Sequence, residues 1–554
     1  MDGIRKPYQQ RLKELSLERE SFIAHYRELM EHFTPRRGKF LDTGQNKGGK
    51  KHNKIIDAHA LFAVRTLASG MMAGMTSPAR PWFRLGVPDP SLAEYEPVRD
   101  WLHTVERRMR QVFASSNFYQ VMPSYYREIG VFGTASMLVV DDLEDVVNFV
   151  PQTVGEYYIA NDRRLRVDTM YRAFKLTVRQ LVQEFGLGNV SASVKHLYEK
   201  GAVDQWIDVV HCIETNMRTD AGSPLAKDMP VKSVYYESSG DSDKLLRESG
   251  FETFPVLAAR WDVVGTDPYG SDCPGMDALG MTKGLQFTQK QKYQGIEKSH
   301  NPPLIGPSSL KNARVSALPG HITYSDVMNG QSGLQPLYKV DPRVDLLLGD
   351  IDDTRRQIDK AFFVDLFLML SNSNRRQITA REIDERHEEK LLMLGPVLER
   401  LQNELLDPTI DAIFHRMQKA GHLPPPPQEL MGQDLKVDYI SVMAQAQKMA
   451  ATAGIERFAG FVGNLAGTTP EALDRLNVDA AIEEYGDAMG ISPNVILSKE
   501  EAGKIRQGRA QAQQQAMQQQ AAQQEIAGAK TLSEIDTSKE NGLTGMLQQL
   551  KGAS

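Results

Sequence analysis

The sequence predicts an α+β fold that is mainly helical. Its 554 residues are enough for three or four domains of ordinary size, each with a sizeable buried core. Apolar residues recur at helical spacing over residues 8–33 and 341–420, whereas strand-like runs are concentrated in the first 270 residues. The first part of the chain is therefore expected to combine sheet with helix, and the remainder to be mostly helical.

The first 275 residues contain the elements of an α+β domain. Helical periodicity predicts helices over residues 8–33, 55–75, 91–115 and 118–132. Thr177 and Gln180 have capping-box spacing and predict the start of another helix. A hairpin is predicted around Asp141–Asp145, and further strands at 157–160, 167–174, 206–217, 233–237 and 254–264. Residues 34–54 are Gly-rich and basic, which is typical of an exposed loop.

Two helices are predicted on either side of a loop-and-strand module. Residues 276–300 predict a helix without a clean apolar stripe, as found at a subunit interface or around a wet cavity. Asn301-Pro302-Pro303 ends this helix, and residues 301–340 are punctuated by Gly and Pro. Asp341-Pro342 predicts the start of the second helix. Its apolar continuation FFVDLFLML is followed by the polar stretch SNSNRRQ.

The longest predicted helix covers residues 379–420. Thr379 and Glu382 have capping-box spacing at its start, and a stripe of Leu, Ile and Met continues to residue 417. Such a helix would be roughly 60 Å long at 1.5 Å per residue. Pro396 and Pro408 each remove a backbone donor, so kinks are expected there. A helix of this length needs large flanking surfaces, which favours a subunit of an assembly.

The C-terminal part of the chain begins with a Pro-rich stretch. LPPPP (423–427) predicts a stiff spacer and a domain boundary within residues 421–434. Residues 435–500 predict helices with Ala- and Gly-rich faces. Nine of the fourteen residues from 511 to 524 are Gln. That stretch cannot bury a core alone, so we expect residues 506–554 to be either disordered or a helix held by neighbouring copies.

Composition excludes several classes of protein. A net charge of −6 argues against a surface that grips nucleic acid tightly, because such binding needs a basic excess. The two cysteines, Cys212 and Cys273, cannot form a disulfide framework and are compatible with the reducing cytoplasm. The N-terminus lacks an apolar signal core, and no run approaches the length of a membrane span. The sequence therefore predicts a soluble product made in the cytoplasm.

One motif imitates a nucleotide-binding loop. Gly44, Gly49 and Lys50 match the phosphate-binding spacing, but Lys51 stands where Ser or Thr should hold magnesium. The preceding residues are too polar for the buried strand that such a loop requires, so a flexible basic loop is favoured. No Cys/His cluster has zinc spacing and no GxSxG elbow is present. We therefore predict no catalytic site, no metal and no cofactor.

Several long runs resemble the head-to-tail connector (portal) proteins of short-tailed phages. They are ITAREIDER, LGPVLERLQNELLDPTIDAIF, LASGMMAGMTSPARPWFRL, NDRRLRVDTMYRAFKLTVRQLVQEFG and NPPLIGP. The resemblance covers most of residues 10–500. It implies a closed ring of twelve identical subunits at one vertex of the capsid. The regions it implies are a wing (1–275 and 378–420), two stem helices (276–300 and 341–362), a clip (301–340), a tunnel loop (363–377) and a crown (435–505).

The resemblance also implies functional residues. In portals the tunnel loop projects into the central channel, and here it would present Asn372, Ser373, Asn374, Arg375 and Arg376. From the residues alone, an ordinary interhelical loop would be favoured for this stretch. Residues of the stem that line the channel or contact a neighbouring subunit would be Lys283, Lys290, Lys292, Lys298 and Arg355, although a solvated helix face explains the lysines equally well. The clip would dock other proteins through Lys311 and Arg314. The wing helix would open with a motif that contains Thr379, Arg381, Glu382 and Arg386.

The resemblance implies partners and a location in the virion. The partners are other copies of the chain, double-stranded DNA held weakly and without sequence preference, the terminase large subunit, a tail adaptor, and the capsid and scaffolding proteins. The expected place is the head–tail junction, with no membrane involved. The implied function is a conduit for DNA packaging and ejection. Two alternatives remain: a packaging ATPase built on residues 44–51, whose nucleotide binding Lys50→Ala would abolish, and a non-viral helical scaffold protein that stays monomeric.

Overall fold

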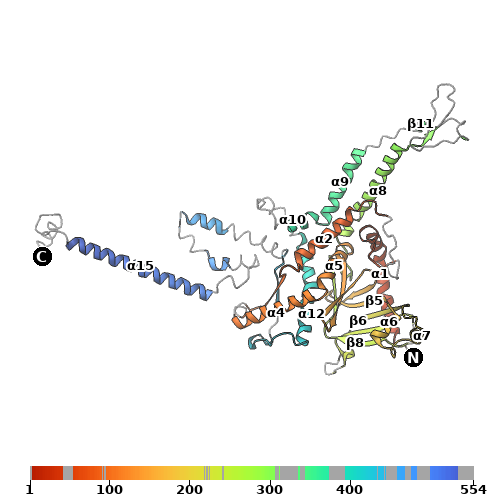
Figure 1. The fold of residues 1–554 in the computed structure, drawn as a ribbon, viewed down its shortest axis with the longest axis horizontal. Helices are drawn as coiled ribbons and strands as arrows, with labels where there is room; N and C mark the ends of the chain where they lie inside the picture. Colours follow the sequence, from red (N-terminus) through yellow and green to blue (C-terminus); the bar gives the residue numbers. More distant parts are fainter. Residues whose placement is uncertain are drawn as a thin grey trace, which may run out of the picture. The chain divides into compact units, whose positions relative to one another are not determined.

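The computed structural model divides into two compact units, Met1–Gln447 and Lys448–Ser554 (Figure 1). The residues that the structure describes are 3–40, 54–89, 92, 95–217, 219, 223, 225–239, 243–305, 311, 335–336, 344–372, 393–432, 435–441, 443, 458–467, 469, 476–482 and 499–533.

A five-stranded antiparallel sheet lies between helices in the first unit. Its strand order is β4-β5-β6-β7-β8. The strands are β4 (Tyr157–Asn161), β5 (Val167–Thr177), β6 (Trp206–Thr215), β7 (Val231–Glu237) and β8 (Arg247–Phe251). Alternate residues of β6 face opposite ways: Val210 packs with Tyr8 and Leu15 of α1 (Lys6–Phe33), whereas Val209 packs beneath α6 (Val178–Phe185) and α7 (Ala192–Glu199). The predicted capping box is confirmed, because Gln180 N donates to Thr177 Oγ1 and Thr177 N donates to Gln180 Oε1.

A second, three-stranded sheet has the order β3-β2-β9. It contains the predicted hairpin, formed by β2 (Thr134–Asp142) and β3 (Val146–Gln152), together with β9 (Val256–Arg260). The Asp142 carboxylate closes the hairpin turn by accepting from the backbone N–H groups of Glu144 and Asp145. Arg260 at the end of β9 is 2% exposed and forms a bidentate ion pair with Glu404, with Nη2–Oε1 at 2.6 Å and Nε–Oε2 at 3.2 Å.

Helices cover these sheets and share the main hydrophobic core with them. They are α1, α2 (His59–Met75), α4 (Glu96–Ser115) and α5 (Phe118–Phe132), close to their predicted positions. Trp82, Phe83, Phe113 and Phe118 form a buried aromatic cluster whose ring centroids lie 4.7–6.1 Å apart in the closest pairs. The sequence predicted an exposed loop over residues 34–54. At its start this prediction is wrong, because Thr34 and Pro35 are buried against this core. Its remainder from residue 41 to 53 lies outside the described residues.

The predicted long helix is seen from residue 393 to Lys419. Residues 393–401 are α-helical, Gln402–Leu406 form a π turn, and α12 covers Asp407–Lys419. The π turn lies directly before Pro408, which cannot donate a backbone hydrogen bond to the preceding turn. A π turn therefore stands just before Pro408, where one kink was expected, whereas residues 393–401 are continuous α-helix around Pro396, where the other was expected. Residues 379–392 lie outside the described part of the chain.

The Pro-rich stretch does not end the first unit. β12 (Lys436–Tyr439) pairs antiparallel with β1 (Phe83–Gly86), and Ile440 N donates to Trp82 O at 3.1 Å. The stretch itself is tied down, since Trp101 Nε1 donates to Pro424 O at 3.0 Å. The boundary thus falls after Gln447 and not within residues 421–434, and the start of the expected crown is a strand of the first unit.

In the second unit, α15 (Lys499–Ser533) is a single helix that includes the Gln-rich stretch. Arg506 on α15 forms an ion pair with Asp479. Residues 458–466 and 478–482 are also helical.

Candidate functional site: the base of the α8–α9 pair

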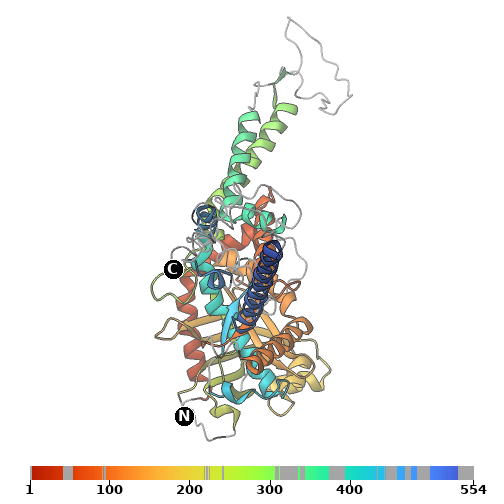
Figure 2. The same cartoon turned by 90° about the vertical axis from the view of Figure 1, so that its left-hand side faces the viewer.

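Two helices of the first unit run side by side and lead away from its sheets (Figure 1, Figure 2). They are α8 (Pro274–His300) and α9 (Val344–Ala361), as predicted for residues 276–300 and 341–362. Beyond them, β10 (Leu304–Ile305) and β11 (Gln335–Pro336) form a short antiparallel ladder. A Cβ at Gly275 would lie 2.5 Å from the carbonyl oxygen of Val131, so only glycine allows the start of α8 to lie this close to α5.

A buried polar network fixes the base of this pair to the segment before α2. Asp57 is 7% exposed, and its Oδ2 accepts from Arg355 Nη2 of α9 at 2.8 Å and from Gln289 Nε2 of α8 at 2.7 Å. Gln286 of α8 accepts from the backbone N–H groups of Ile56 and Asp57 and donates to Asp57 O at 2.9 Å. One carboxylate therefore connects three segments that are far apart in the sequence.

The electrostatics of Asp57 favour its charged form. Burial raises the pKa of this carboxyl group, but hydrogen bonds from His59 N, Arg355 and Gln289, together with the charge of Arg355, outweigh burial and lower the pKa below its usual value. Arg355 responds in the opposite sense, because its bond to Asp57 raises the pKa of the guanidinium. The pair is ionised at neutral pH and acts as a fixed joint.

Two buried glutamines explain why α8 lacks a clean apolar stripe. Gln286 and Gln289 lie on the buried face of α8 with Ala278 and Leu285. Their hydrogen-bond partners belong to the same chain, so this polarity serves the joint within the subunit. Polar residues in the middle of an otherwise apolar face are the signal that could have identified the joint from the sequence.

The structure distributes the predicted stem cations between two environments. Arg355 points into the joint, and Lys283 forms an ion pair of 3.0 Å with Glu28 of α1. Lys292 lies over the ring of Tyr293, with Nζ 5.1 Å from the ring centroid. Lys290 and Lys298 are exposed and form no ion pair with the described residues. The exposed lysines that form no ion pair with the described residues therefore lie from residue 290 to the C-terminal end of α8.

The helical pair also exposes large apolar side chains. Phe287 and Tyr293 of α8 are 62% and 54% exposed, and Leu346 and Leu348 of α9 are 61% and 45% exposed. Polar helices that nevertheless present such side chains to solvent are typical of surfaces that contact another protein.

The two helices carry opposite net charge. In α8, four lysines against Asp277 and Glu297 give +2, with histidine neutral. In α9, five aspartates against Arg355, Arg356 and Lys360 give −2.

A sharp bend follows α9, where the expected tunnel loop begins. Phe363 has φ +54°, and α10 (Val364–Asn372) follows at once, with Leu366 and Phe367 buried. The apolar run VDLFLML is thus a helix packed on α2, where Gly70 leaves room for the ring of Phe367. The loop does not begin at residue 363, because the first nine residues after Phe363 are helical.

Most of the other predicted site residues lie outside the described residues. Asn372 is the last residue of α10, and Lys311 is exposed. The remaining residues are Ser373, Asn374, Arg375, Arg376, Arg314, Thr379, Arg381, Glu382 and Arg386, and none of them is described.

The described side chains include no group of three or more His, Cys, Asp or Glu that could share a metal ion. None of the helices in this part of the chain combines the length and apolarity needed to cross a bilayer.

Comparison with known proteins gives one consistent result. A family model described as bacteriophage head to tail connecting protein matches residues 5–497. The chain is 50% identical over 535 residues to the portal protein of Salmonella phage epsilon15, covering 97% of this chain and 96% of that protein. It is 45% identical over 548 residues to the probable portal protein of Bordetella phage BPP-1, covering 99% of each.

Proposed function

The chain belongs to the family of bacteriophage head-to-tail connecting proteins, the portal proteins, and on this basis we propose that twelve copies close into a ring around a DNA channel. A ring of identical subunits requires a heterologous interface that closes by rotation, so each subunit must present two different complementary surfaces. The observation that carries the proposal is the exposed α8–α9 pair, because it supplies surfaces of this kind.

The α8–α9 pair supports the proposal in two ways. Its side chains Phe287, Tyr293, Leu346 and Leu348 are 45–62% exposed, so the described residues leave much of their apolar surface uncovered. Its helices have net charges of +2 and −2, so the α8 of one copy is complementary to the α9 of the next. The joint at Asp57 holds the pair at a fixed angle to its own wing, which a closed ring requires of every copy.

The channel is proposed to hold DNA only weakly. Twelve copies at −6 each give roughly −72 per ring. Acidic walls repel phosphates, whereas each neutralised phosphate adds salt-dependent affinity that would slow the passage of DNA. In this arrangement Arg375 and Arg376, on the loop after α10, form the basic ring that guides the duplex.

The other regions follow the family arrangement. Residues 1–275 and 378–420 form the wing, and the clip at 301–340 docks the terminase large subunit and later the tail adaptor, with Lys311 and Arg314 at the contact. The wing faces capsid and scaffolding proteins at the head–tail junction. The second unit forms the crown, with α15 packed against its copies in neighbouring subunits.

The nucleotide-driven alternative has no support in these findings. The connector family match spans the loop at 44–51. The run MLVVDD (137–142) imitates the apolar strand and acid that an ATPase also needs. It belongs to β2, which is antiparallel to both of its neighbours in the sheet. The acids serve the hairpin turn and an ion pair between Asp141 and Arg416.

The decisive experiment is the mass and rotational symmetry of the purified full chain. Light scattering should give the mass of about twelve subunits, and negative-stain class averages should show twelvefold rings with a central hole. A compact monomer that binds ATP and loses that binding in Lys50→Ala would overturn the proposal.

A further inference from the structure

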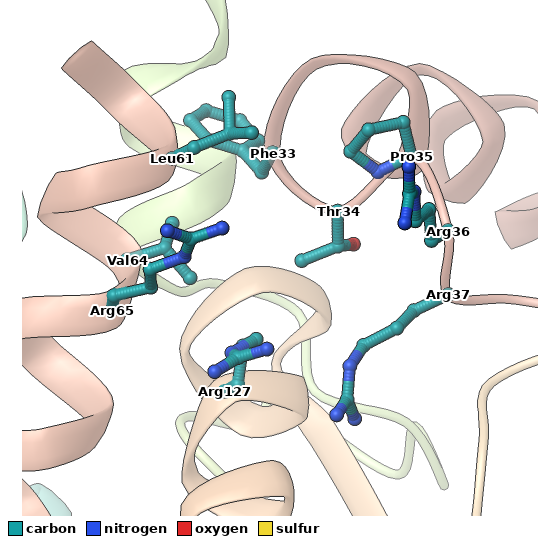
Figure 3. Close-up of a pocket in the computed structure, with 9 residues that line it drawn as sticks. All are labelled: Phe33, Thr34, Pro35, Arg36, Arg37, Leu61, Val64, Arg65 and Arg127. Carbon is teal, nitrogen blue, oxygen red and sulfur yellow. The ribbon is translucent and has the colours of Figure 1, made fainter. Parts of the chain in front are cut away.

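Four arginines of the first unit surround one small cavity (Figure 3). Arg36 and Arg37 follow the end of α1, Arg65 projects from α2, and Arg127 projects from α5. The cavity measures about 120 Å³, the space of roughly four water molecules at ~30 Å³ each. Figure 3 shows the guanidinium groups of Arg37, Arg65 and Arg127 on different sides of the space next to Thr34.

The positive charge of this cluster is not balanced by the described residues. Arg36, Arg65 and Arg127 form no ion pair with any described carboxylate. Arg37 is 3.7 Å from Glu128 Oε1 and also donates to Ser124 Oγ at 2.8 Å. Glu128 is buried and already accepts hydrogen bonds from Thr153 Oγ1 and Val154 N. Among the described carboxylates, Glu128 alone pairs with any of the four arginines, and it pairs only with Arg37.

Two buried polar atoms at the cavity lack partners. Arg127 Nε and Thr34 Oγ1 are both shielded from solvent and make no hydrogen bond within the described part of the chain. Thr34 is only 6% exposed. Leaving such groups unsatisfied costs on the order of 1–3 kcal/mol each, so their occurrence together beside one cavity needs an explanation.

Electrostatic repulsion within the cluster also favours a bound anion. Burial lowers the pKa of Arg127, and the charges of Arg37 and Arg65 lower it further. Arginines that repel one another are stabilised together by an anion whose oxygens can accept from several guanidinium groups at once. The apolar side chains of Phe33, Leu61 and Val64 also line the cavity and strengthen such contacts by excluding water.

We propose that this arginine pocket binds a phosphate oxyanion. A phosphate group has oxygens for Arg65, Arg127 and Arg37 and one for the Thr34 hydroxyl, and its negative charge offsets the excess that Glu128 leaves. A single carboxylate has two oxygens and one charge, so it satisfies fewer of these groups. The ligand is therefore free inorganic phosphate, because a phosphodiester in the backbone of duplex DNA has only two free oxygens and one charge, as a carboxylate has.

The test is a titration of the full chain with inorganic phosphate by isothermal calorimetry, at neutral pH and constant ionic strength with chloride as the balancing anion. Wild-type protein should bind phosphate. Arg65→Gln with Arg127→Gln should weaken binding about a hundredfold, at roughly tenfold for each lost charge-assisted contact. The matched control is Arg163→Gln, at an exposed arginine in the β4–β5 turn, which should bind as wild type does.

Three further observations complete the test. The double variant should melt no lower than wild type in phosphate-free buffer, because it removes repelling charges. Short duplex DNA should not compete with phosphate in wild type, and competition at constant ionic strength would overturn the preference for inorganic phosphate over a phosphodiester. Equal phosphate binding by wild type and the double variant, or no binding by either, overturns the proposal. Density for a neighbouring subunit's carboxylate in the pocket of the assembled ring also overturns it.

Discussion

Asp57, just before α2, accepts a hydrogen bond of 2.8 Å from Arg355 of α9, which follows it in the chain by 298 residues. This contact fixes the direction in which the α8–α9 pair leaves the rest of the first unit. Because the carboxylate is buried and the guanidinium is partly exposed, the two partners are not equivalent. Loss of Arg355 leaves a buried carboxylate without its charged partner, whereas loss of Asp57 leaves a guanidinium that water can still reach.

Arg355→Gln should lower the free energy of unfolding by about 1–3 kcal/mol, since it leaves the buried Asp57 charge with neutral partners only. The measurement is chemical denaturation of the full chain, followed by a probe of the first unit. Arg356→Gln is the matched control, because Arg356 is exposed and its ion pair with Asp353 is 3.6 Å long. Similar losses in both variants would show that the contact with Asp57 contributes nothing specific.

The Asp57 joint should weaken on acidification. A carboxyl group whose pKa is lowered on folding contributes stability that is present above its unfolded value of 3.8 and is lost as the pH falls through the folded value. As the pH falls below 3.8, wild type should therefore lose more stability than Asp57→Asn does. The melting temperatures of the two proteins, plotted against pH, should converge. Exposed Asp353→Asn serves as the control. A constant difference between wild type and Asp57→Asn at every pH would contradict the assignment.

Glu404→Gln should destabilise the first unit by about 3–5 kcal/mol. Arg260 is 2% exposed and would keep a buried charge without its bidentate partner. Thermal melting of the variant beside Glu399→Gln, which changes an exposed glutamate on the same helix, isolates the effect. A melting temperature equal to that of the control would mean that Asn161 Oδ1 and Leu165 O satisfy Arg260 without the carboxylate.

Phe287→Ser should impair ring assembly and leave the subunit folded. The ring of Phe287 is largely exposed in the subunit, and burying such a side chain at an interface contributes about 1.5–3 kcal/mol. Analytical ultracentrifugation should show a shift toward smaller species, with unchanged circular dichroism. Phe287→Leu keeps an apolar side chain and should assemble; rings formed equally well by both variants would place the subunit interface elsewhere.

Reversal of the two arginines proposed for the tunnel loop, Arg375→Glu with Arg376→Glu, should leave ring assembly intact and lower the retention of packaged DNA. The acidic ring would repel the duplex that the arginines are proposed to guide. The measurement is the yield of packaged DNA per particle, with Arg375→Lys and Arg376→Lys as the charge-preserving control. Normal DNA yield from the double reversal would remove these residues from the proposed mechanism.

Local signals in the sequence predicted elements well where the elements depend on local contacts. The capping box at Thr177 and Gln180 and the turn at Asp142 are made by residues within three positions of each other, so their patterns are complete in the sequence. The π turn lies just before Pro408, one of the two prolines where the sequence predicted a kink.

Elements that depend on distant partners were not predicted. β8 (RESGF) has no strand alternation and is a strand because β7 pairs with it. β12 pairs with a strand about 350 residues earlier, so the Pro-rich stretch before it was interpreted as a boundary. The arginine pocket was missed because TPRRGK has the composition of a loop, and its other two arginines come from α2 and α5. Arg355 was identified from the resemblance, but its buried partner Asp57 was not.

The β1–β12 ladder has a practical consequence for work on fragments. The Pro-rich stretch suggests Gly421 as the end of a fragment. A truncation there would remove β12, the only described strand neighbour of β1, and with it the hydrogen bond that Tyr439 donates to Asp407. The uncovered strand edge next to Trp82 and Phe83 would be free to recruit the same edge of another molecule. Fragments cut there should precipitate, whereas fragments that extend to Gln447 retain their own capping strand.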